Sequence, residues 1–207
     1  FEMAINSALF NKIFQQSIIA YHVTDDIDIP CPNPYQTGSI EHILFVKNWI
    51  DTVQWHMEDL IRVEDIDPNE ALKIKRDIDA SNQDRTDTVE KFEDYLFSEF
   101  KEVKLKPGAR VNTETPGWAM DRLSILNLKL YHFKEELNRE GISVAHYEKC
   151  KRKVAVLEEQ YLDLSNSIDD LLEEIASGKC EIKVYRQMKM YNDEELNPML
   201  RKKESQV

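Results

Sequence analysis

The feature that most constrains the fold of this chain is the position of its helix-breaking residues. The 207 residues include only five glycines and seven prolines. Inside a helix a glycine costs about 1 kcal/mol and a proline about 3 kcal/mol. Five long intervals contain neither residue except at their ends, so we predict helices there, over residues 5–24, 39–62, 68–102, 116–140 and 143–177.

Apolar residues repeat at helical spacing within these intervals. The third interval has the clearest start, because Asp67 suits a helix cap, Pro68 the first helical position and Glu70 the third. After Gly178 apolar and charged residues alternate, as in an extended strand. One strand alone is not stable, so this segment needs a partner. The sequence offers the Val103–Lys106 segment, a second copy of the chain, or the bundle surface.

These patterns predict an all-α fold, a largely antiparallel bundle of about five long helices with a short extended C-terminal arm. We expect a helical bundle domain at residues 1–178. Residues 179–207 would form an extended arm and tail, packed on the same domain or exchanged between copies. The last residues, from Arg201 onward, indicate a frayed tail.

Composition excludes several classes of protein. The net charge of −12 disfavours nucleic acid as a partner. No run of about 18 apolar residues is present, so a membrane span is not expected. The three cysteines form no CxxC pair, which favours free thiols in a reducing compartment and thus a cytoplasmic protein.

The apolar face of the third helix is interrupted by polar residues. At 100° per residue Arg85 falls between Ile78 and Phe92 on that face, and Ser81 and Asn82 lie within it or at its edge. A buried charge costs several kcal/mol unless it is paired. We therefore expect a polar centre around Arg85.

The depth of this centre follows from the connection at residues 63–67. If the second and third helices form an antiparallel hairpin there, Arg85 is level with Lys47 and Asn48, and Asp51 is the nearest carboxylate on the second helix. Lys47 and Asp51 are four residues apart and would pair on the surface. The centre would then be either a buried polar network that fixes helix register or a ligand site, since arginine recognises carboxylates and phosphates.

Other residues extend the hypothesis of a ligand site. Asp51 and Asp121 are candidate catalytic carboxylates. Asn48 and Arg122 are further candidates for ligand binding, and Trp55 would form one wall of a pocket. Asp25 and Asp26 follow the first helix and are candidate ligands for Mg²⁺. The alternative is a solvated loop, which acidic residues of this kind form more often. Each of the five histidines is expected to be structural, because they are scattered over four helices.

Named cofactor motifs are absent. No Glu-x-x-His pair of a di-iron bundle, glycine-rich nucleotide loop or HExxH sequence occurs. We expect no haem, flavin, NAD or di-iron centre, and Mg²⁺ is the cofactor that remains open.

Several segments together indicate a lineage. They are Tyr21–Asp26, Asn33–Tyr35, Lys47–His56, Ser81–Asp87, Asn112–Gly117, Asp121–Ser124 and Lys183–Asn192. Collectively they resemble the domain of unknown function 4254 family, which occurs mainly in Bacteroidota. The resemblance covers nearly the whole chain and implies a cytoplasmic bacterial protein. It supplies no catalytic residues.

Two functional hypotheses remain. The first is a small-molecule enzyme or anionic-ligand-binding protein with a polar cleft around Arg85, in which Asn82 orients the ligand and carboxylates act as a base or hold Mg²⁺. The second is a structural or partner-binding protein whose buried polar residues only specify packing. In that case the segment Val184–Tyr191, rich in Met and Tyr, would dock on a second copy or on another protein.

Overall fold

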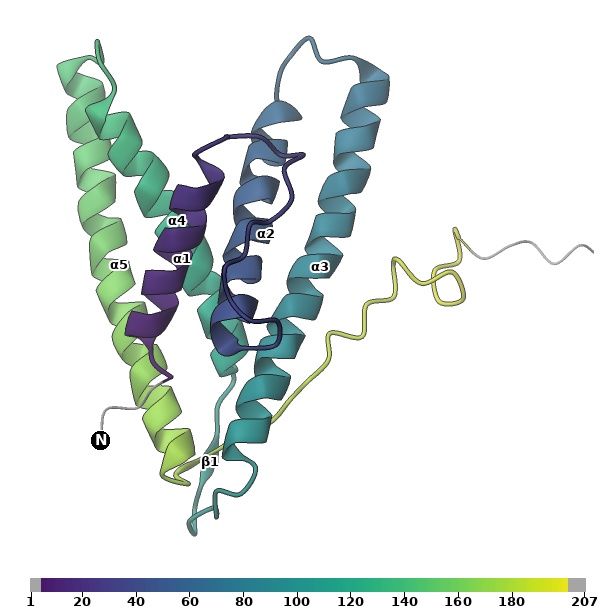
Figure 1. The fold of residues 1–207 in the computed structure, drawn as a ribbon, viewed down its shortest axis with the longest axis vertical. Helices are drawn as coiled ribbons and strands as arrows, with labels where there is room; N and C mark the ends of the chain where they lie inside the picture. Colours follow the sequence, from purple (N-terminus) through teal and green to yellow (C-terminus); the bar gives the residue numbers. More distant parts are fainter. Residues whose placement is uncertain (1–4, 201–207) are drawn as a thin grey trace, which may run out of the picture.

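The computed structural model describes residues 5–200, and within them it confirms the five predicted helices (Figure 1). Each helix begins and ends within a few residues of its predicted bounds. The helices are α1 Ser7–Tyr21, α2 Ile40–Leu60, α3 Pro68–Phe100, α4 Pro116–Asn138 and α5 Val144–Ala176, and two short strands are β1 Arg110–Val111 and β2 Cys180–Glu181.

Local capping explains where the helices start. The side chain of the residue before each helix accepts a hydrogen bond from a backbone N–H of the first turn, which would otherwise lack a partner. These caps are Asn6, Ser39, Asp67, Thr115 and Ser143. Pro68 and Pro116 occupy the first helical positions, where proline needs no N–H partner.

The helices form two antiparallel hairpins, α2–α3 and α4–α5, with α1 packed between them (Figure 1). The connection at residues 22–39 carries the chain back along the molecule, so that α1 and α2 run in the same direction. The hairpins lie close together near β1 and separate toward their opposite tips. No helix in residues 5–200 is long and apolar enough to cross a membrane.

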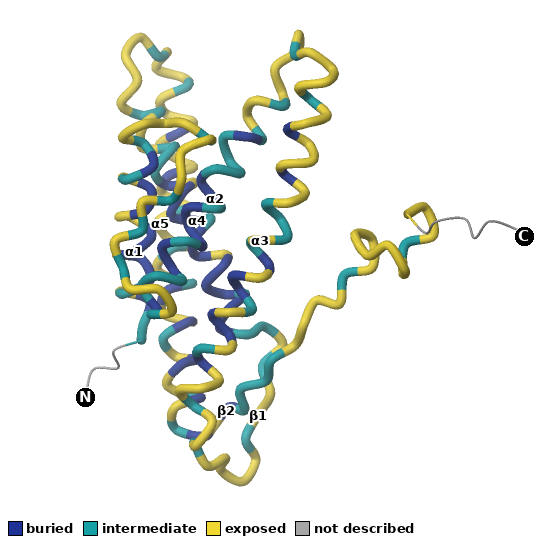
Figure 2. Tube along the Cα trace, turned by 45° about the vertical axis from the view of Figure 1, so that its right-hand side comes forward, coloured by how far each residue is buried: buried dark blue, intermediate teal, exposed yellow. Residues whose placement is uncertain are grey.

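The main core lies between all five helices, whose inner sides are buried (Figure 2). It includes the fully buried Phe14, Leu44, Phe92, Leu123 and Leu172. On α2 the apolar residues that recur at helical spacing, 43, 46, 50 and 53, are only half buried, although Met57 in the same series is buried. Because α1, α3 and α4 cover α2 from several sides, its deepest positions include polar residues. One apolar stripe therefore does not identify its inward face.

The chain after α5 pairs with the connection between α3 and α4. Strand β2 lies parallel to β1, with Arg110 opposite Cys180, and the N–H of Lys106 donates to the Gly178 carbonyl at 2.9 Å. Of the partners that the sequence left open, the Val103–Lys106 segment lies close to Gly178 and forms this hydrogen bond, but the strand partner is β1. We call this pairing the strap.

Beyond the strap the arm contacts the acidic outer face of α3. Arg186 lies 2.7 Å from Asp94, and Lys189 donates to the Thr86 hydroxyl at 2.9 Å. The arm is otherwise largely exposed and extends away from the bundle (Figure 2). The tail predicted from Arg201 lies outside the described residues.

Candidate functional site

A group of charged side chains is buried where α2, α3 and α4 meet. Lys47 is fully buried, and its Nζ lies against Asp51 and 3.0 Å from Oδ1 of Asp121. Asp51 and Asp121 are 6% and 3% exposed. Lys47 and Asp51 do pair, but the expected surface position is wrong, because α4 covers this side of α2. We call Lys47, Asp51, Arg85 and Asp121 the polar centre.

Arg85 is held from α4. Its Nε and Nη2 donate to the two carboxylate oxygens of Asp121 at 2.7 and 2.6 Å, a bidentate pair. The expected partner Asp51 also contributes, but its Oδ1 is 3.7 Å from Nε. The carboxylate expected on α2 is therefore close to Arg85, while its bidentate partner comes from α4.

Amides and hydroxyls surround the polar centre. Asn48 donates to the Ser124 hydroxyl at 3.0 Å, and that hydroxyl donates to Asp51 at 2.6 Å. Asn82 accepts a hydrogen bond from Gln54 at 3.0 Å and lies in the half-buried layer nearer to solvent. Ser81, Asn82 and Arg85 thus face inward as predicted, and Asp84 and Asp87 are exposed.

A cleft of about 290 Å³ opens at the edge of the polar centre. Its wall includes Arg85, whose side chain remains 28% exposed, together with Asp51, Gln54 and Trp55. Glu58, Asp59 and Arg62 line its outer part. Arg85, Asp51 and Trp55, three of the candidate residues, thus line one cleft.

The pKa values of the two carboxyls in the polar centre are shifted in opposite directions. Burial raises the pKa of Asp51, and the nearby Asp121 adds to the rise against the opposing charge of Lys47. Burial would also raise the pKa of Asp121, but the hydrogen bond from Arg85 and the charge of Lys47 bring it below its usual value. Two carboxyls whose acidities are driven apart are typical of acid–base sites and also of structural ion networks.

The other predicted candidates lie apart from this cleft. Arg122 is exposed and donates to both carboxylate oxygens of Glu114 at 2.9 and 2.8 Å, beside a depression between α4 and α5. Asp26 accepts a hydrogen bond from the backbone of Asp28, and Asp25 instead lies beside His56. Asp25 and Asp26 therefore do not converge on the polar centre.

Three histidines that are far apart in the sequence lie close together in the fold. His22 at the end of α1, His56 on α2 and His132 on α4 each present a ring nitrogen, and these three atoms lie within 4.8 Å of one another. We call them the histidine cluster. Burial lowers the pKa of His56 and of His132. For His56 the nearby Asp25 opposes this and His22 adds to it, and for His132 both neighbouring imidazoles lower the pKa further.

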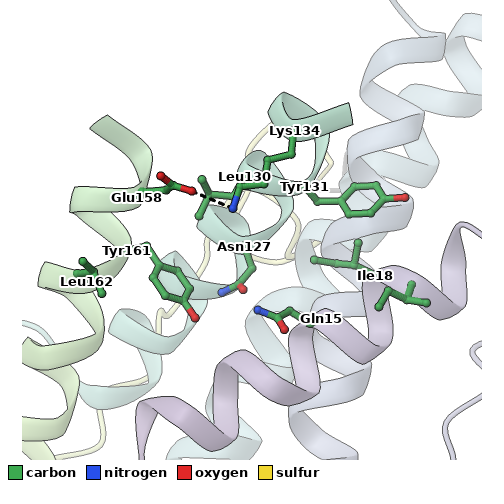
Figure 3. A pocket seen from close by; sticks show the side chains of 10 residues that line it. Gln15, Ile18, Asn127, Leu130, Tyr131, Lys134, Glu158, Tyr161 and Leu162 are labelled. Carbon is green, nitrogen blue, oxygen red and sulfur yellow. Dashed lines mark ion pairs between the residues drawn. The ribbon is translucent and has the colours of Figure 1, made fainter. Parts of the chain in front are cut away.

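A larger and more apolar pocket of about 580 Å³ lies between α1, α4 and α5. Ile18, Leu130 and Tyr161 point into it from the three helices, and Lys134 pairs with Glu158 at its rim (Figure 3). Tyr131 belongs to this wall, and its ring also packs against His22 at 4.4 Å. The histidine cluster thus lies between this pocket and the cleft.

Comparison with known sequences places the chain in a family. The family described as "Protein of unknown function (DUF4254)" matches residues 41–184, well over half of the chain. The chain is a DUF4254 protein. No curated protein and no solved structure matches it.

The region that defines this DUF4254 protein as a member contains α2 to α5 and so includes the entire polar centre. His56 and His132 also lie within it, whereas His22 precedes it. The sequence did not predict the histidine cluster because the relative direction of α1 and α2 depends on the path of residues 22–39. A signal was nevertheless present: His22, His56 and His132 all lie in the C-terminal part of a helix, and three parallel helices bring such positions together.

Proposed function

We propose that this protein binds a small anionic molecule in the cleft beside Arg85. The observation that carries the proposal is the way Asp121 holds the guanidinium. Asp121 occupies Nε and Nη2 along one edge, and within residues 5–200 no hydrogen bond engages Nη1. Since a guanidinium has five N–H donors, its other edge remains available for a carboxylate or phosphate.

The rigidity of this arrangement favours binding. A long side chain that is already held in place loses less conformational entropy when a ligand arrives. Arg85 lines the cleft while its charge is balanced in the core by Asp121, and the stacked ring of Trp55 gives the cleft an apolar wall. A ligand with an anionic end and a flat or apolar body fits this combination.

The remaining predicted residues take supporting roles. Gln54 lines the cleft and is hydrogen-bonded to Asn82, so Asn82 would orient the ligand indirectly. Asn48 would act from deeper still, through Ser124 and Asp51. If the bound molecule reacts, Asp51 is the base, because it lines the cleft and burial raises its pKa. Mg²⁺ would enter with a phosphate ligand.

Binding can be tested with inorganic phosphate and with citrate as separate probes, by calorimetric titration and by thermal unfolding. We expect each active probe to raise the melting temperature of the wild-type chain. Arg85→Lys keeps a cation near Asp121 but loses the planar fork, so affinity should fall at least about tenfold. Arg122→Met removes an exposed arginine outside the cleft and should bind as the wild type does.

Two results would count against the cleft. One is that neither probe binds to the wild-type chain. The other is that Arg85→Lys binds as tightly as the wild type, because the anion would then be held elsewhere.

A second candidate function rests on the completeness of the polar centre. Its two cations and two carboxylates balance, and all four are paired. A buried network of this kind also serves a protein that only needs a defined helix register. In that case the exposed apolar residues of the arm would be the working surface, for a second copy or another protein.

We also propose a cytoplasmic location. All three cysteines, Cys31, Cys150 and Cys180, are free thiols, as expected in a reducing compartment.

A further inference from the structure

We propose that the histidine cluster is a binding site for a divalent transition-metal ion such as Zn²⁺. The site lies on the far side of Trp55 from the cleft, since that ring stacks on His132 at 4.9 Å and also lines the cleft wall. It is independent of the anion-binding proposal, and its ligands are three imidazoles from three different helices.

The spacing of the ligand atoms fits a metal ion. Two nitrogens bound to one tetrahedral zinc ion are about 3.3 Å apart, because each Zn–N bond is about 2.0–2.1 Å long. The Nε2 atoms of His22 and His56 are 3.3 Å apart. The third imidazole, from His132, presents a nitrogen within 4.8 Å of both, a distance that a small rotation of the ring would close.

The outer nitrogens of two rings have the partners that metal-bound histidines usually have. Histidine ligands commonly donate their second N–H to a backbone carbonyl or a carboxylate, which orients the ring toward the metal. Nδ1 of His22 lies 2.7 Å from the Ile18 carbonyl, and Nδ1 of His132 lies 3.5 Å from the Glu135 carboxylate. Both contacts leave Nε2 free to face the centre of the cluster.

An unpartnered atom at this place also indicates a ligand. Nε2 of His132 is buried and has no hydrogen-bond partner. Buried polar atoms without a partner are rare in native proteins and call for a physical explanation. A metal ion bound to Nε2 would supply the missing partner.

The surroundings suit a dehydrated cation. Three aromatic rings cover the imidazoles: Tyr21 stacks on His56, Trp55 stacks on His132, and Tyr131 packs against His22. These rings cover the imidazoles in part, and the side chains of His56 and His132 remain 20% and 19% exposed. Imidazole nitrogen favours zinc, copper, nickel and iron over magnesium or calcium, which prefer oxygen.

Asp25 supplies a carboxylate for the fourth position. Its Oδ1 lies 3.7 Å from Nε2 of His56, and its backbone N–H donates to the Tyr21 carbonyl at 2.9 Å. The residue has φ +51°, a left-handed conformation that aspartate tolerates better than most residues. This geometry turns the chain at the end of α1 and brings the carboxylate back toward the three imidazoles.

The test uses untagged full-length protein that has been stripped with a chelator. Zn²⁺ affinity is measured by competition calorimetry, and Co²⁺ is used as a spectroscopic probe of nitrogen coordination. We expect one equivalent of Zn²⁺ to bind and a visible Co²⁺ spectrum typical of a four-coordinate site. His22→Gln and His132→Gln should each weaken Zn²⁺ binding more than about tenfold.

Matched controls separate the cluster from general histidine chemistry. His42→Gln and His146→Gln remove imidazoles outside the cluster and should leave both readouts unchanged. His22 stands at a helix end and is only half buried, so His22→Gln is the variant to rely on if His132→Gln fails to fold, as judged by circular dichroism.

The proposal is overturned if the stripped wild-type chain binds no stoichiometric Zn²⁺. It is also overturned if His22→Gln, correctly folded, keeps the wild-type affinity and the wild-type Co²⁺ spectrum. Either result would make the cluster an aromatic packing unit in which His22 and His56 share one N–H···N hydrogen bond.

Discussion

The ammonium group of Lys47 is sealed from solvent, so its charge is balanced by protein atoms alone. Asp51 and Asp121 form ion pairs with it, and Arg85 pairs with Asp121 on the side of the cleft. Removing one member of a buried ion network leaves another charge without a partner. This lowers stability more than replacing the whole pair by apolar residues would. Each of the four side chains therefore depends on the other three.

We expect Lys47→Met to lower the free energy of unfolding by about 3–5 kcal/mol, because Asp51 would lose its principal cation. Urea denaturation measures the change. Lys75→Met is the matched control, since the pair of Lys75 with Asp79 is exposed and should contribute less than about 1 kcal/mol. Equal small losses in both variants would mean that the Lys47 pair adds nothing to stability.

At this scale the sequence predicted part of the polar centre. The apolar period on α3 identified Arg85 as inward-facing, and the hairpin made Asp51 its nearest carboxylate on α2. Asp121 could not be recognised as its bidentate partner, because that contact depends on how α4 is rotated against α3. Rotation between helices that are not joined by a short turn is set by packing of the whole core.

The first turn of α4 is held by a side chain of α3. Glu93 of α3 is buried and accepts a hydrogen bond from the Gly117 N–H at 3.0 Å, in the first turn of α4. A Cβ on Gly117 would lie 2.4 Å from that carboxylate oxygen. A larger residue at this position would therefore have to displace the Glu93 side chain and break this hydrogen bond, although the φ of Gly117 is ordinary.

Burial raises the pKa of Glu93 above its ordinary value of 4.5, against the hydrogen bonds from Thr115 and Gly117 and the charge of Arg186, with Asp94 adding to the rise. A carboxyl with a raised folded-state pKa holds its proton more tightly when folded. Its contribution to stability is therefore full below about pH 4.5 and declines as the pH rises through the folded-state pKa.

We expect Glu93→Gln to remove that decline, because a glutamine carbonyl still accepts from Gly117 but does not ionise. The measurement is the difference in unfolding free energy between variant and wild type from pH 4 to pH 7. The difference should shift in favour of the variant as the pH rises. A constant difference across the range would show that Glu93 does not titrate with a raised pKa.

The bounds of the helices were predictable because breakers and caps act locally. The return of the chain over residues 22–39 was not, because a proline-rich connection of that length fits either direction of α1 relative to α2. Only the structure reveals that His22, His56 and His132 reach the same end of the bundle. The inward face of α2 was missed for a related reason, since a central helix has neighbours on several sides.

At the scale of the whole molecule, the arm combines exposed apolar side chains with polar contacts to the bundle. Tyr185, Met188 and Tyr191 are 63%, 80% and 64% exposed, while Arg186 holds the arm on the acidic face of α3. Polar tethers thus position a segment whose apolar side chains face solvent. Exposed apolar surface of this kind is typical of a contact with another chain.

We expect a chain truncated after Val184 to be monomeric under conditions in which the full-length chain forms dimers, because the apolar arm residues would bury themselves against a second copy. Light scattering after size-exclusion chromatography measures the mass. The truncation leaves β2 intact, so circular dichroism should be unchanged. If both chains are monomers over the same concentration range, the arm does not join copies of this protein.

The strap has a consequence for the order in which the chain folds. It joins residue 110 to residue 180, and all of α4 and α5 lies between them. Closing so long a loop from an unfolded chain is entropically unfavourable, but the antiparallel α4–α5 hairpin brings its own two ends together first. The strap should therefore form late in folding and open early in unfolding, and the arm that follows it acquires its path along α3 only once the bundle is assembled.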